Sequence, residues 1–508
     1  MADSAECKYV RAESQDDSSS GKGSSDANKA TTISLVRPGP KPAETVAKFH
    51  PQFTYPIFGE AQTIFGYSNL RINLHFATHD LRPNLTVTWD KQYPAVQDTV
   101  ATDVKGTLEE WLPPTSFEPL PKWYDEIQTD KSAKDFHPPG KLLSSYKINN
   151  KTYEIWHGQL ADSAIRRILT HMQIFIPFFV EGGTYIHLED PDWSLHRWSI
   201  FLLYEKLEEV SDPTKAPYSF IGYCTAYRYF FLATSPETAL KPSSSEPTFP
   251  FPQTDHTELP SRQRISQFLI LPPYHRQGHG SHFYTALTTA FMADPSIHEI
   301  TVEDPNESFD DLRDFCDLAR LRQIPEFTSL SINTTVQIPS KGRLPTDELL
   351  SPAILNALRA KTKIAPRQFQ RLVEMQLLSR IPAPYRRSSH AGPNAPTLST
   401  ANATDPEWEQ QYRRWCLLTK QRLYKFNRDS LAQLDRPERL DKLEEVLDSV
   451  EAGYVDFLER AHAVSDVDVA GKRKAGLSGE SSEETLKNGG GLDDANGDEG
   501  PATKKVKI

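Results

Sequence analysis

The sequence predicts an α/β fold, in which a mixed sheet with helices is preceded by a small mixed or β domain and followed by a helical C-terminal region. The centre of the chain carries strand-like runs, one helical pattern and a last strand, an order that implies a mixed α/β sheet. Before it, short apolar runs are mixed with many prolines. After position 340 the patterns are helical. The strand-like runs lie at 198–204, 220–231, 266–271 and 299–303.

Composition narrows the class of protein. A chain of 508 residues has room for about three domains of ordinary size. Its net charge of −11 argues against a protein that coats nucleic acid and favours a basic partner. The four cysteines have neither metal nor disulfide spacing, which indicates a reducing intracellular compartment. The most apolar stretch, Met172–Val180, is far shorter than the roughly 20 residues of a membrane span, and no secretory signal precedes it. We expect a protein without membrane association.

Polar and proline-rich segments divide the chain. Both ends are rich in Ser, Gly, Asp and Glu with little to bury, so ordering them would cost entropy without compensation. The segment 235–260 has the composition of an inserted loop. The expected parts are a disordered tail at 1–30, a small mixed or β domain at 31–150, the α/β core at 151–330, a helical region at 331–465 with a linker near 385–406, and a disordered tail at 466–508.

Helical periodicity identifies the expected helices. Between 163 and 179 the apolar residues recur at helical spacing, which predicts an amphipathic helix. A second helix is expected at 281–292, directly after the third strand-like run. In the C-terminal third the expected helices are Pro352–Leu358, Ala365–Leu378, Glu407–Phe426 and Leu431–Tyr454.

The stretch "LILPPYHRQGHGSHFYTAL", residues 269–287, predicts an anion site. A strand, two prolines, a Gly-x-Gly loop and a helix follow one another, so the N–H groups of the loop and first helical turn converge on one spot. Gly278 and Gly280 allow a phosphate to approach the main chain, and Arg276 can add a charge-assisted contact. A tight helix entry without a ligand remains the alternative.

Two known phosphate loops do not fit this spacing. A P-loop needs a Gly-Lys-Ser/Thr ending, and a dinucleotide fingerprint needs a third glycine where Phe283 stands. The stretch resembles instead the cofactor motif of the GNAT superfamily of acetyl-CoA-dependent N-acetyltransferases, Gln/Arg-x-x-Gly-x-Gly/Ala after a strand. The family's Gln/Arg position is His275 here. Because this loop works through its backbone, we expect the departure to matter little.

The GNAT resemblance implies which residues hold acetyl-CoA. The strand would bond the pantetheine arm through main-chain groups of Phe268, Leu269 and Ile270. The loop would hold the pyrophosphate through His275, Arg276, Gln277, Gly278, His279, Gly280 and Ser281.

Four blocks narrow the resemblance to the catalytic subunits of type B histone acetyltransferases: "FGEAQTIFGYSNLRI", "GYCTAYRYFF", "RISQFLILPPYHRQGHGSHFY" and "ITVEDPNESFDDLRDF". The similarity runs from about 51 to 378. It implies transfer of acetyl from acetyl-CoA to lysines in the tail of newly made free histone, chiefly histone four, in support of chromatin assembly, silencing and DNA repair. It also implies a WD-repeat β-propeller histone chaperone as partner, with location in the cytoplasm and nucleus. We expect no metal and no direct binding of nucleic acid.

Two adjacent acids are the predicted catalytic groups. Lysine has a pKa of about 10.4, so freeing its amine at neutral pH costs roughly 4 kcal/mol and calls for a base. Glu303 and Asp304 follow the strand after the loop, at the edge of an α/β sheet where ligands bind. In the resembled family the glutamate of "VEDPN" is the base, and the next aspartate and a second glutamate, here Glu181, share the role. The alternative is a turn with solvated acids.

Further contacts are implied by the resemblance alone. Asn306, Phe309 and Arg313 would touch the cofactor; an N-cap asparagine and a core aromatic are the alternatives for the first two. Trp198 would pack along the substrate lysine, or it is a core tryptophan. The histone tail would contact Glu60, Ala61, Gln62, Tyr227, Arg228 and Tyr229. Acids near the expected cleft would attract a basic peptide: Glu181, Glu303, Asp304, Glu307, Asp310 and Asp311.

Other chemistries fit less well. A thioester route through Cys224 or Cys316 needs an activated thiolate, and buried inert cysteines are the more common case. His275, His279 and His282 lack a fourth ligand at metal-binding spacing. Two alternative functions stay open: acetylation of a small amine or a protein N-terminus, and a non-catalytic adapter for histone or CoA. Short basic clusters that could serve nuclear import are Lys472–Lys474 and Lys504, Lys505 and Lys507.

Overall fold

The structure, a computed structural model, separates into two compact units, Met1–Asp304 and Pro305–Ile508, each described here by itself. The described residues are 23–39, 43–95, 100–187, 194–207, 215–231, 259–339, 342–386 and 405–477, with side chains as far as 461. Most of the expected insertion at 235–260, most of the linker near 385–406 and the lysines at 504, 505 and 507 lie outside them.

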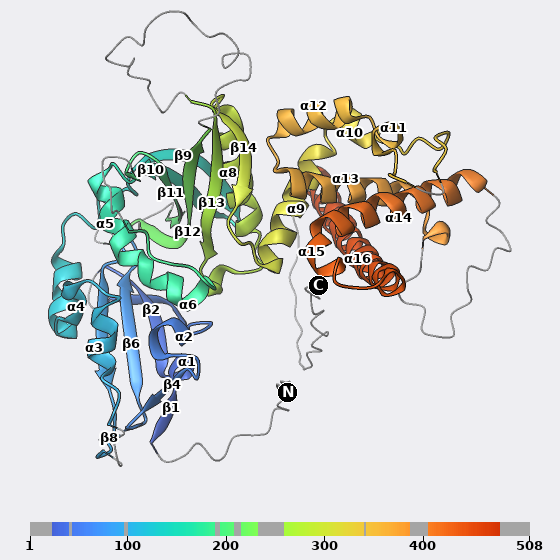
Figure 1. The fold of residues 1–508 in the computed structure, drawn as a ribbon. Helices are drawn as coiled ribbons and strands as arrows, with labels where there is room; N and C mark the ends of the chain where they lie inside the picture. Colours follow the sequence, from blue (N-terminus) through green and yellow to red (C-terminus); the bar gives the residue numbers. More distant parts are fainter. Residues whose placement is uncertain are drawn as a thin grey trace, which may run out of the picture. The chain divides into compact units, whose positions relative to one another are not determined.

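The first unit begins with a four-stranded sheet in the order β3-β2-β6-β7, whose two central strands, β2 and β6, are labelled in Figure 1. Strand β2 pairs parallel with β6, and the other two pairs are antiparallel. Ile33, Leu35, Leu74 and Phe76 have no exposed surface. Most of β6 alternates buried and less buried residues, whereas residues 33–37 of β2, a strand with a neighbour on each side, are all buried. The strands are β2 (Thr31–Arg37), β3 (Glu44–Phe49), β6 (Arg71–Ala77) and β7 (Pro83–Thr88).

Short elements complete this N-terminal region. Residues 24–30 form β1 and α1, so the disordered tail expected at 1–30 is too long. The Asp26 carboxylate accepts hydrogen bonds from the N–H groups of Asn28 and Lys29 and so caps α1. The polar composition of the tail does not reveal that these residues are ordered. The elements are β1 (Ser24–Asp26), α1 (Ala27–Ala30), α2 (Tyr55–Phe58), β4 (Thr63–Phe65), β5 (Tyr67–Ser68), β8 (Lys91–Gln92), α3 (Val104–Glu109), a 3-10 turn (Pro114–Phe117) and α4 (Leu120–Thr129).

The core of the first unit is a six-stranded mixed sheet in the order β14-β13-β12-β11-β10-β9. All neighbours are antiparallel except β13 and β14, which are parallel. The sheet begins at Lys141, ahead of the boundary expected at 151, because β9 pairs with β10 as a hairpin. Its strands are β9 (Lys141–Ile148), β10 (Lys151–Gln159), β11 (Trp198–Lys206), β12 (Tyr218–Phe230), β13 (Ser261–Ile270) and β14 (Ile297–Val302).

Helices pack on this sheet. The single helix expected at 163–179 is broken into α5 (Ser163–Met172), a 3-10 turn (Gln173–Phe175) and α6 (Ile176–Phe179), since Pro177 has no N–H to continue the helix. Phe175 lies 4.9 Å, ring to ring, from Phe76 of β6 and 6.4 Å from Phe220 of β12, so this turn joins the two sheets. Figure 1 shows α6 between them. Helix α8 (His279–Ala293) connects β13 to β14.

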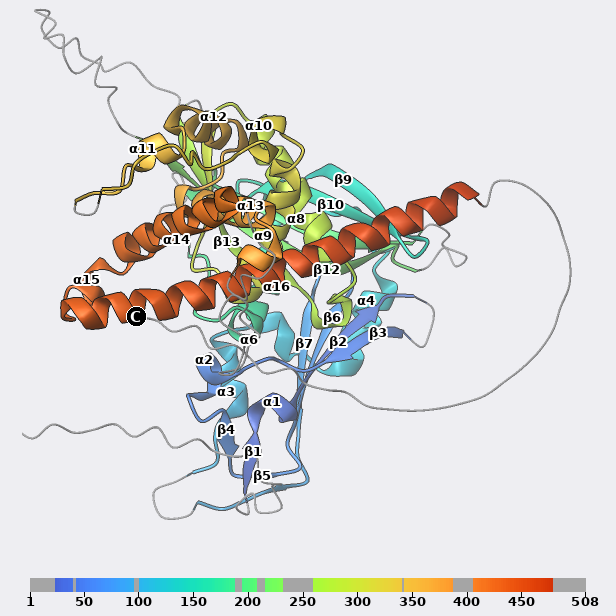
Figure 2. The same cartoon turned by 90° about the vertical axis from the view of Figure 1, so that its right-hand side faces the viewer.

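The second unit is helical, and Figure 2 shows α14 and α16 running side by side. Trp415, Leu372, Leu378 and Leu447 have no exposed surface in its core. The α/β core therefore ends at Asp304 rather than at 330, and α16 continues past 466, where the tail was expected to begin. The helices are α9 (Glu307–Leu321), α10 (Pro325–Thr328), α11 (Thr346–Leu349), α12 (Pro352–Thr362), α13 (Pro366–Arg380), a 3-10 turn (Ala383–Tyr385), α14 (Pro406–Phe426), α15 (Arg428–Leu431) and α16 (Arg436–Leu477). Among the described helices, none has the length and apolar character needed to cross a membrane.

Candidate active site

The parting of two parallel strands defines the site. The ladder between β13 and β14 ends at the pair Ile265–Val302. The ladder between β13 and β12 continues to Ile270. Phe268, Leu269 and Ile270, the residues predicted to bond pantetheine, therefore lie beyond the point where β14 leaves β13. The carboxyl ends of parallel strands share one sheet edge, where ligands of α/β proteins bind.

The loop after β13 has the backbone that an anion cradle needs. Arg276 and Gly278 adopt positive φ angles of 58° and 87°, and Gly278 is the N-cap of α8 without a side chain to cap the helix. A Cβ at Gly278 would meet only the Cδ1 atom of Ile148, at 3.9 Å, so this side of the loop is open. Residues 275–278 are exposed. The first N–H groups of α8 and the positive end of its dipole lie at this opening, which fits a phosphate.

His275 contacts the end of β13, whereas His279 and His282, in the first turn of α8, both contact Tyr146 of β9. His275 Nε2 lies 2.6 Å from the Ile270 carbonyl oxygen, and His279 Nδ1 lies 2.9 Å from the Tyr146 hydroxyl oxygen. His282 stacks on Tyr146 with ring centroids 4.3 Å apart. Within the described ranges, no group of three His, Cys, Asp or Glu side chains could hold a metal ion.

The His279 side chain anchors the start of α8 rather than facing the loop opening. It is 1% exposed, and its ring lies 4.5 Å from that of Tyr153 on β10. Burial, with a smaller contribution from the charge of His282, lowers the pKa of His279 to about 4. Only its main chain is left for the predicted cofactor contact.

The lowered pKa predicts an acid-sensitive α8. The unfolded chain binds a proton on this histidine below pH 6.5, while the folded chain does so only near pH 4. The contribution of His279 to stability is therefore complete above pH 6.5 and is lost as the pH falls toward 4. Between pH 7 and 5 the wild-type chain should lose about 2 kcal/mol more unfolding free energy than His279→Gln, as measured by urea unfolding. An equal loss in both proteins would contradict the assignment.

Glu303 stands at the end of β14, beside the parted strands. Its N–H donates to the Ile265 carbonyl oxygen at 2.9 Å. The Ser266 hydroxyl donates to Glu303 Oε2 at 2.7 Å, and Arg264 Nη1 lies 3.7 Å from Oε1. The Glu303 side chain is 46% exposed, so its carboxylate is open to a substrate. Asp304 follows with a φ of 32°, which turns the chain sharply at this point.

Glu181 begins a segment that is hydrogen-bonded to β13. It follows α6 and is exposed. The Gln267 side-chain amide donates to the Thr184 carbonyl oxygen at 3.0 Å. The segment after Glu181 and the carboxylate of Glu303 are thus held by the neighbouring residues Gln267 and Ser266 of β13.

The predicted substrate aromatics form one group on β11 and β12. Trp198 and Tyr227 are cross-strand partners with rings 4.9 Å apart, and Tyr229 lies 4.8 Å from Tyr227. Arg197 stacks over Tyr227 at 4.6 Å and Arg264 over Tyr229 at 4.8 Å. Trp198 is half-buried, so part of its ring is available to a substrate, and its contact with the substrate lysine stays a prediction.

Arg228 differs from its two neighbours. Its guanidinium bonds to Asp294, in the turn before β14, and lies 3.4 Å from Gln263 Oε1. The main-chain N–H of Arg228 donates to the Arg197 carbonyl oxygen at 2.9 Å. The Arg228 side chain therefore links β12 to β13 and to the turn before β14. This structural role is an alternative to the substrate contact predicted for Arg228.

The Glu60–Gln62 segment is a turn between α2 and β4. Glu60 and Ala61 are exposed. The Gln62 side-chain oxygen accepts from the Thr54 N–H at 2.8 Å and the Asn28 amide at 3.0 Å, so this side chain holds the turn. Any tail contact by the segment would fall to the two exposed residues.

Asn306, Phe309 and Arg313 belong to the second unit. The Asn306 side chain accepts the Phe309 N–H at 2.9 Å and caps α9, as the alternative interpretation predicted. Arg313 is 8% exposed and pairs with Asp310 at 2.5 Å. Their cofactor contacts remain predictions.

The thiol of Cys224 is not suited to nucleophilic catalysis. Cys224 has no exposed surface and burial raises the pKa of its thiol well above the usual value, so it is not an activated nucleophile.

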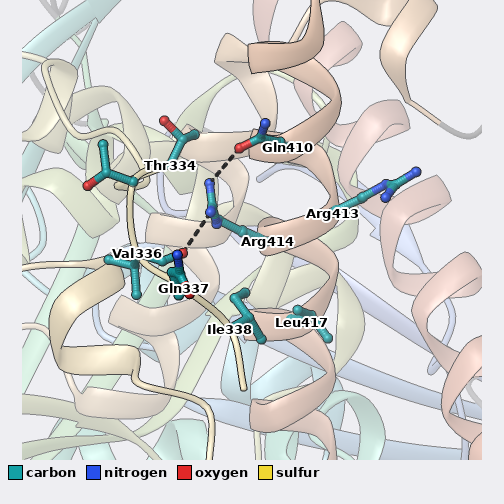
Figure 3. Close-up of a pocket in the computed structure, with 9 residues that line it drawn as sticks. Thr334, Val336, Gln337, Ile338, Gln410, Arg413, Arg414 and Leu417 are labelled. Carbon is teal, nitrogen blue, oxygen red and sulfur yellow. Dashed lines mark hydrogen bonds between the residues drawn. The ribbon is translucent and has the colours of Figure 1, made fainter. Parts of the chain in front are cut away.

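A hollow in the helical unit lies between residues 334–338 and α14, where Arg414 donates to the Val336 carbonyl oxygen at 2.8 Å (Figure 3). None of the predicted site residues lines it.

Sequence reasoning missed Arg197, Arg264 and Ser266. The expected strand began at 266, whereas β13 begins at Ser261 and alternates buried and half-exposed residues along its whole length. An alternation that starts at Ser261 would have placed Arg264 and Ser266 on one face.

Comparison with known proteins shows the family to which the chain belongs. Residues 23–181 match the family model "Histone acetyl transferase HAT1 N-terminus", and residues 314–381 match "Fungal HAT1, C-terminal". The chain is 43% identical over 463 residues to a histone acetyltransferase type B catalytic subunit of Aspergillus oryzae, covering 90% of this chain and 89% of the relative. For the same subunit of Pyricularia oryzae the identity is 39% over 494 residues, covering 95% and 97%.

A solved aminoglycoside acetyltransferase from a soil metagenomic sample matches 39% of this chain and all of its own at 15% identity, with a TM-score of 0.21, too low to carry an argument. The identity and coverage of the two fungal relatives show the family without this structure. The chain belongs to the family of histone acetyltransferase type B catalytic subunits and is a histone acetyltransferase with a GNAT-like α/β core.

Proposed function

We propose that this chain acetylates lysines in the N-terminal tail of free, newly made histone, chiefly histone four, by direct attack assisted by a carboxylate base. The observation that carries the proposal is the parting of β13 and β14 at Ile265–Val302, with the open Gly278 loop after one strand and Glu303 after the other. One ligand can then span both features, with its phosphate end at the loop and its acyl end near the acid.

The residues present fit acetyl-CoA. Main-chain groups at 268–270 continue past the β14 ladder and are suited to bond the pantetheine arm. The loop at 275–281 and the start of α8 are suited to hold the pyrophosphate, since the loop is open at Gly278. The bound thioester supplies an activated acetyl group, which the protein need not activate covalently.

The acids supply the base. The Glu303 carboxylate accepts a proton from the lysine ammonium, which gives the free amine. The amine attacks the thioester carbonyl carbon, the new C–N bond replaces the C–S bond, and coenzyme A leaves as its thiol after taking up the proton that the amine loses. Asp304 adjoins Glu303, and Glu181 is exposed after α6, so both acids are proposed to share the role. The buried state of Cys224 supports direct attack over a thioester on the enzyme.

The substrate is recognised by charge and by aromatic surface. Trp198, Tyr227 and Tyr229 offer half-exposed rings on which the aliphatic stem of a lysine can pack. Exposed acids at Glu181, Glu303 and Asp304 favour a peptide rich in Lys and Arg.

The cellular setting is part of the same proposal. The chain acts on newly made histones in the cytoplasm and in the nucleus, with a WD-repeat β-propeller histone chaperone as partner, as the resemblance of its sequence implies. Roles in chromatin assembly, silencing and DNA repair would follow from that substrate.

Mass-spectrometric mapping tests the proposal. With acetyl-CoA, we expect acetylation to concentrate on lysines of the histone four tail in free histone, and to be far weaker on nucleosomes, polyamines and protein N-termini. Preference for polyamines or N-terminal amines would support the alternative enzyme. Absence of any acetylated product would support the non-catalytic adapter.

A further inference from the structure

Polar side chains on β13 make two cross-strand contacts with β14. Arg262, Arg264 and Ser266 alternate with buried residues, so they share the half-exposed face of β13. Arg262 Nε lies 2.8 Å from Glu299 Oε1, outside the site. At the other end of the ladder, Arg264 and Ser266 both contact the Glu303 carboxylate. The first contact holds two strands together, whereas the second also determines where a catalytic group stands.

The Glu303 carboxylate would otherwise be free to rotate. Its main chain is fixed by the bond to the Ile265 carbonyl oxygen, but its side chain is 46% exposed and has several rotatable bonds. The 2.7 Å bond from the Ser266 hydroxyl fixes Oε2. Ser266 is the residue that the ladder between β12 and β13 skips, at a register shift, and its neighbours Ile265 and Gln267 are both paired with β12. The donor is therefore held in place from both sides.

Arg264 stands further away and has a second partner. Its Nη1 atom is 3.7 Å from Glu303 Oε1, beyond hydrogen-bond distance. Its guanidinium lies 4.8 Å from the centre of the Tyr229 ring, and Nη1 is 3.4 Å from the Tyr229 hydroxyl oxygen. Oε1 is therefore the oxygen at which a lysine ammonium can replace the arginine.

From this geometry we propose that Ser266 is a positioning residue for the general base, fixing Glu303 Oε2 so that Oε1 faces the substrate lysine, with Arg264 as the counter-ion until the lysine arrives. The inference rests on the proposed function, because it assumes that Glu303 is the base. The serine donates a proton to a carboxylate and accepts none, so it stabilises and orients the anion without entering the transfer.

The test compares Ser266→Ala with Ser266→Thr. Loss of the hydroxyl should lower kcat about tenfold or more and leave KM for acetyl-CoA unchanged, since hydrogen bonds to charged groups are among the stronger ones. Threonine keeps the hydroxyl and suits a strand, so it should restore most of kcat. Removing the donor from the anion should also move the acidic limb of the kcat–pH profile to higher pH. The groups that face this carboxylate are Ser266, Arg264 and, through Arg264, Tyr229, with Asp304 adjacent.

Glu299→Gln is the matched control, because it removes the other cross-strand carboxylate on the same two strands. It should leave kcat and its pH profile unchanged. If Ser266→Ala retains wild-type kcat, or if Glu299→Gln lowers kcat as much, the positioning role is overturned.

A double variant separates this inference from the proposed function. In a Glu303→Gln background, Ser266→Ala should cause no further loss, because the serine acts only through that carboxylate. A further tenfold loss there would overturn the positioning role and leave the base intact. Full activity of Glu303→Gln alone would instead overturn the base assignment and this inference with it.

Discussion

Glu303→Gln is expected to reduce kcat by about 10²- to 10⁴-fold, the usual contribution of a positioned general base. The amide cannot take a proton from lysine, yet it keeps the size of the side chain and can still bond the Ser266 hydroxyl. Binding of acetyl-CoA should be unchanged, because the predicted contacts at 268–270 and 275–281 do not involve this side chain. Steady-state kinetics with a histone tail peptide measures the first effect and calorimetric titration the second.

Asp304→Asn and Glu181→Gln are the comparison variants. If the two acids share the role, each should lower kcat less than Glu303→Gln does, because neither is held at the parted strands by a serine hydroxyl. A Glu303→Gln protein with kcat within threefold of wild type would show that another group is the base. A larger loss from Glu181→Gln would identify that group.

Arg422→Ala is expected to destabilise the helical unit by about 3–5 kcal/mol, because it leaves a buried carboxylate without its counter-ion. Arg422 of α14 bonds both oxygens of Glu374 on α13, at 2.7 and 2.8 Å, and the Tyr454 hydroxyl donates to the same carboxylate at 3.0 Å. Glu374 is 7% exposed. Burial lowers the pKa of Arg422, but the electrostatic interactions with Tyr454 and Glu374 and the hydrogen bond to Glu374 together raise it by more, consistent with a pair that stays ionised.

Arg413→Ala on the same helix is the matched control for this prediction. Arg413 also pairs with a glutamate, Glu409, at 2.6 Å, but the two side chains are 74% and 55% exposed. Its loss should cost less than about 1 kcal/mol. Hydrogen exchange of the α13 and α14 amides measures both variants in the full chain. Equal protection in the two variants would mean that the buried pair contributes no more than a surface pair.

The elements that could be predicted are those with a strong apolar pattern. Strands β11 and β12 and helix α8 lie close to the predicted positions, because their runs of apolar residues have few competing interpretations. The start of β13 was missed since Arg262 and Arg264 resemble loop residues until their pairing with β14 is known. The helix expected at 163–179 was broken because Pro177 outweighs a continuous apolar stripe.

The same contrast holds for the residues of the candidate site. Glu303 could be placed from sequence because it ends a strand beside a glycine loop. The roles of Ser266, Arg264 and Gln267 depend on which residues of neighbouring elements face each other, which periodicity along one strand does not specify. The buried pair of Glu374 and Arg422 was missed for a related reason, since a helical pattern identifies the apolar stripe but not which polar residues are enclosed with it.

The central claim is that the loop at 275–281 holds the phosphate end of coenzyme A beside the carboxylate of Glu303. Calorimetric titration of the full chain with coenzyme A tests it most directly when Gly278→Val is titrated in parallel. At the φ of 87° seen at Gly278, a β-branched residue is strained, and its Cβ occupies the open side of the loop. We predict saturable one-to-one binding by the wild-type chain and at least tenfold weaker binding by the variant. No heat with the wild-type chain, or equal affinity in the two proteins, would contradict the account.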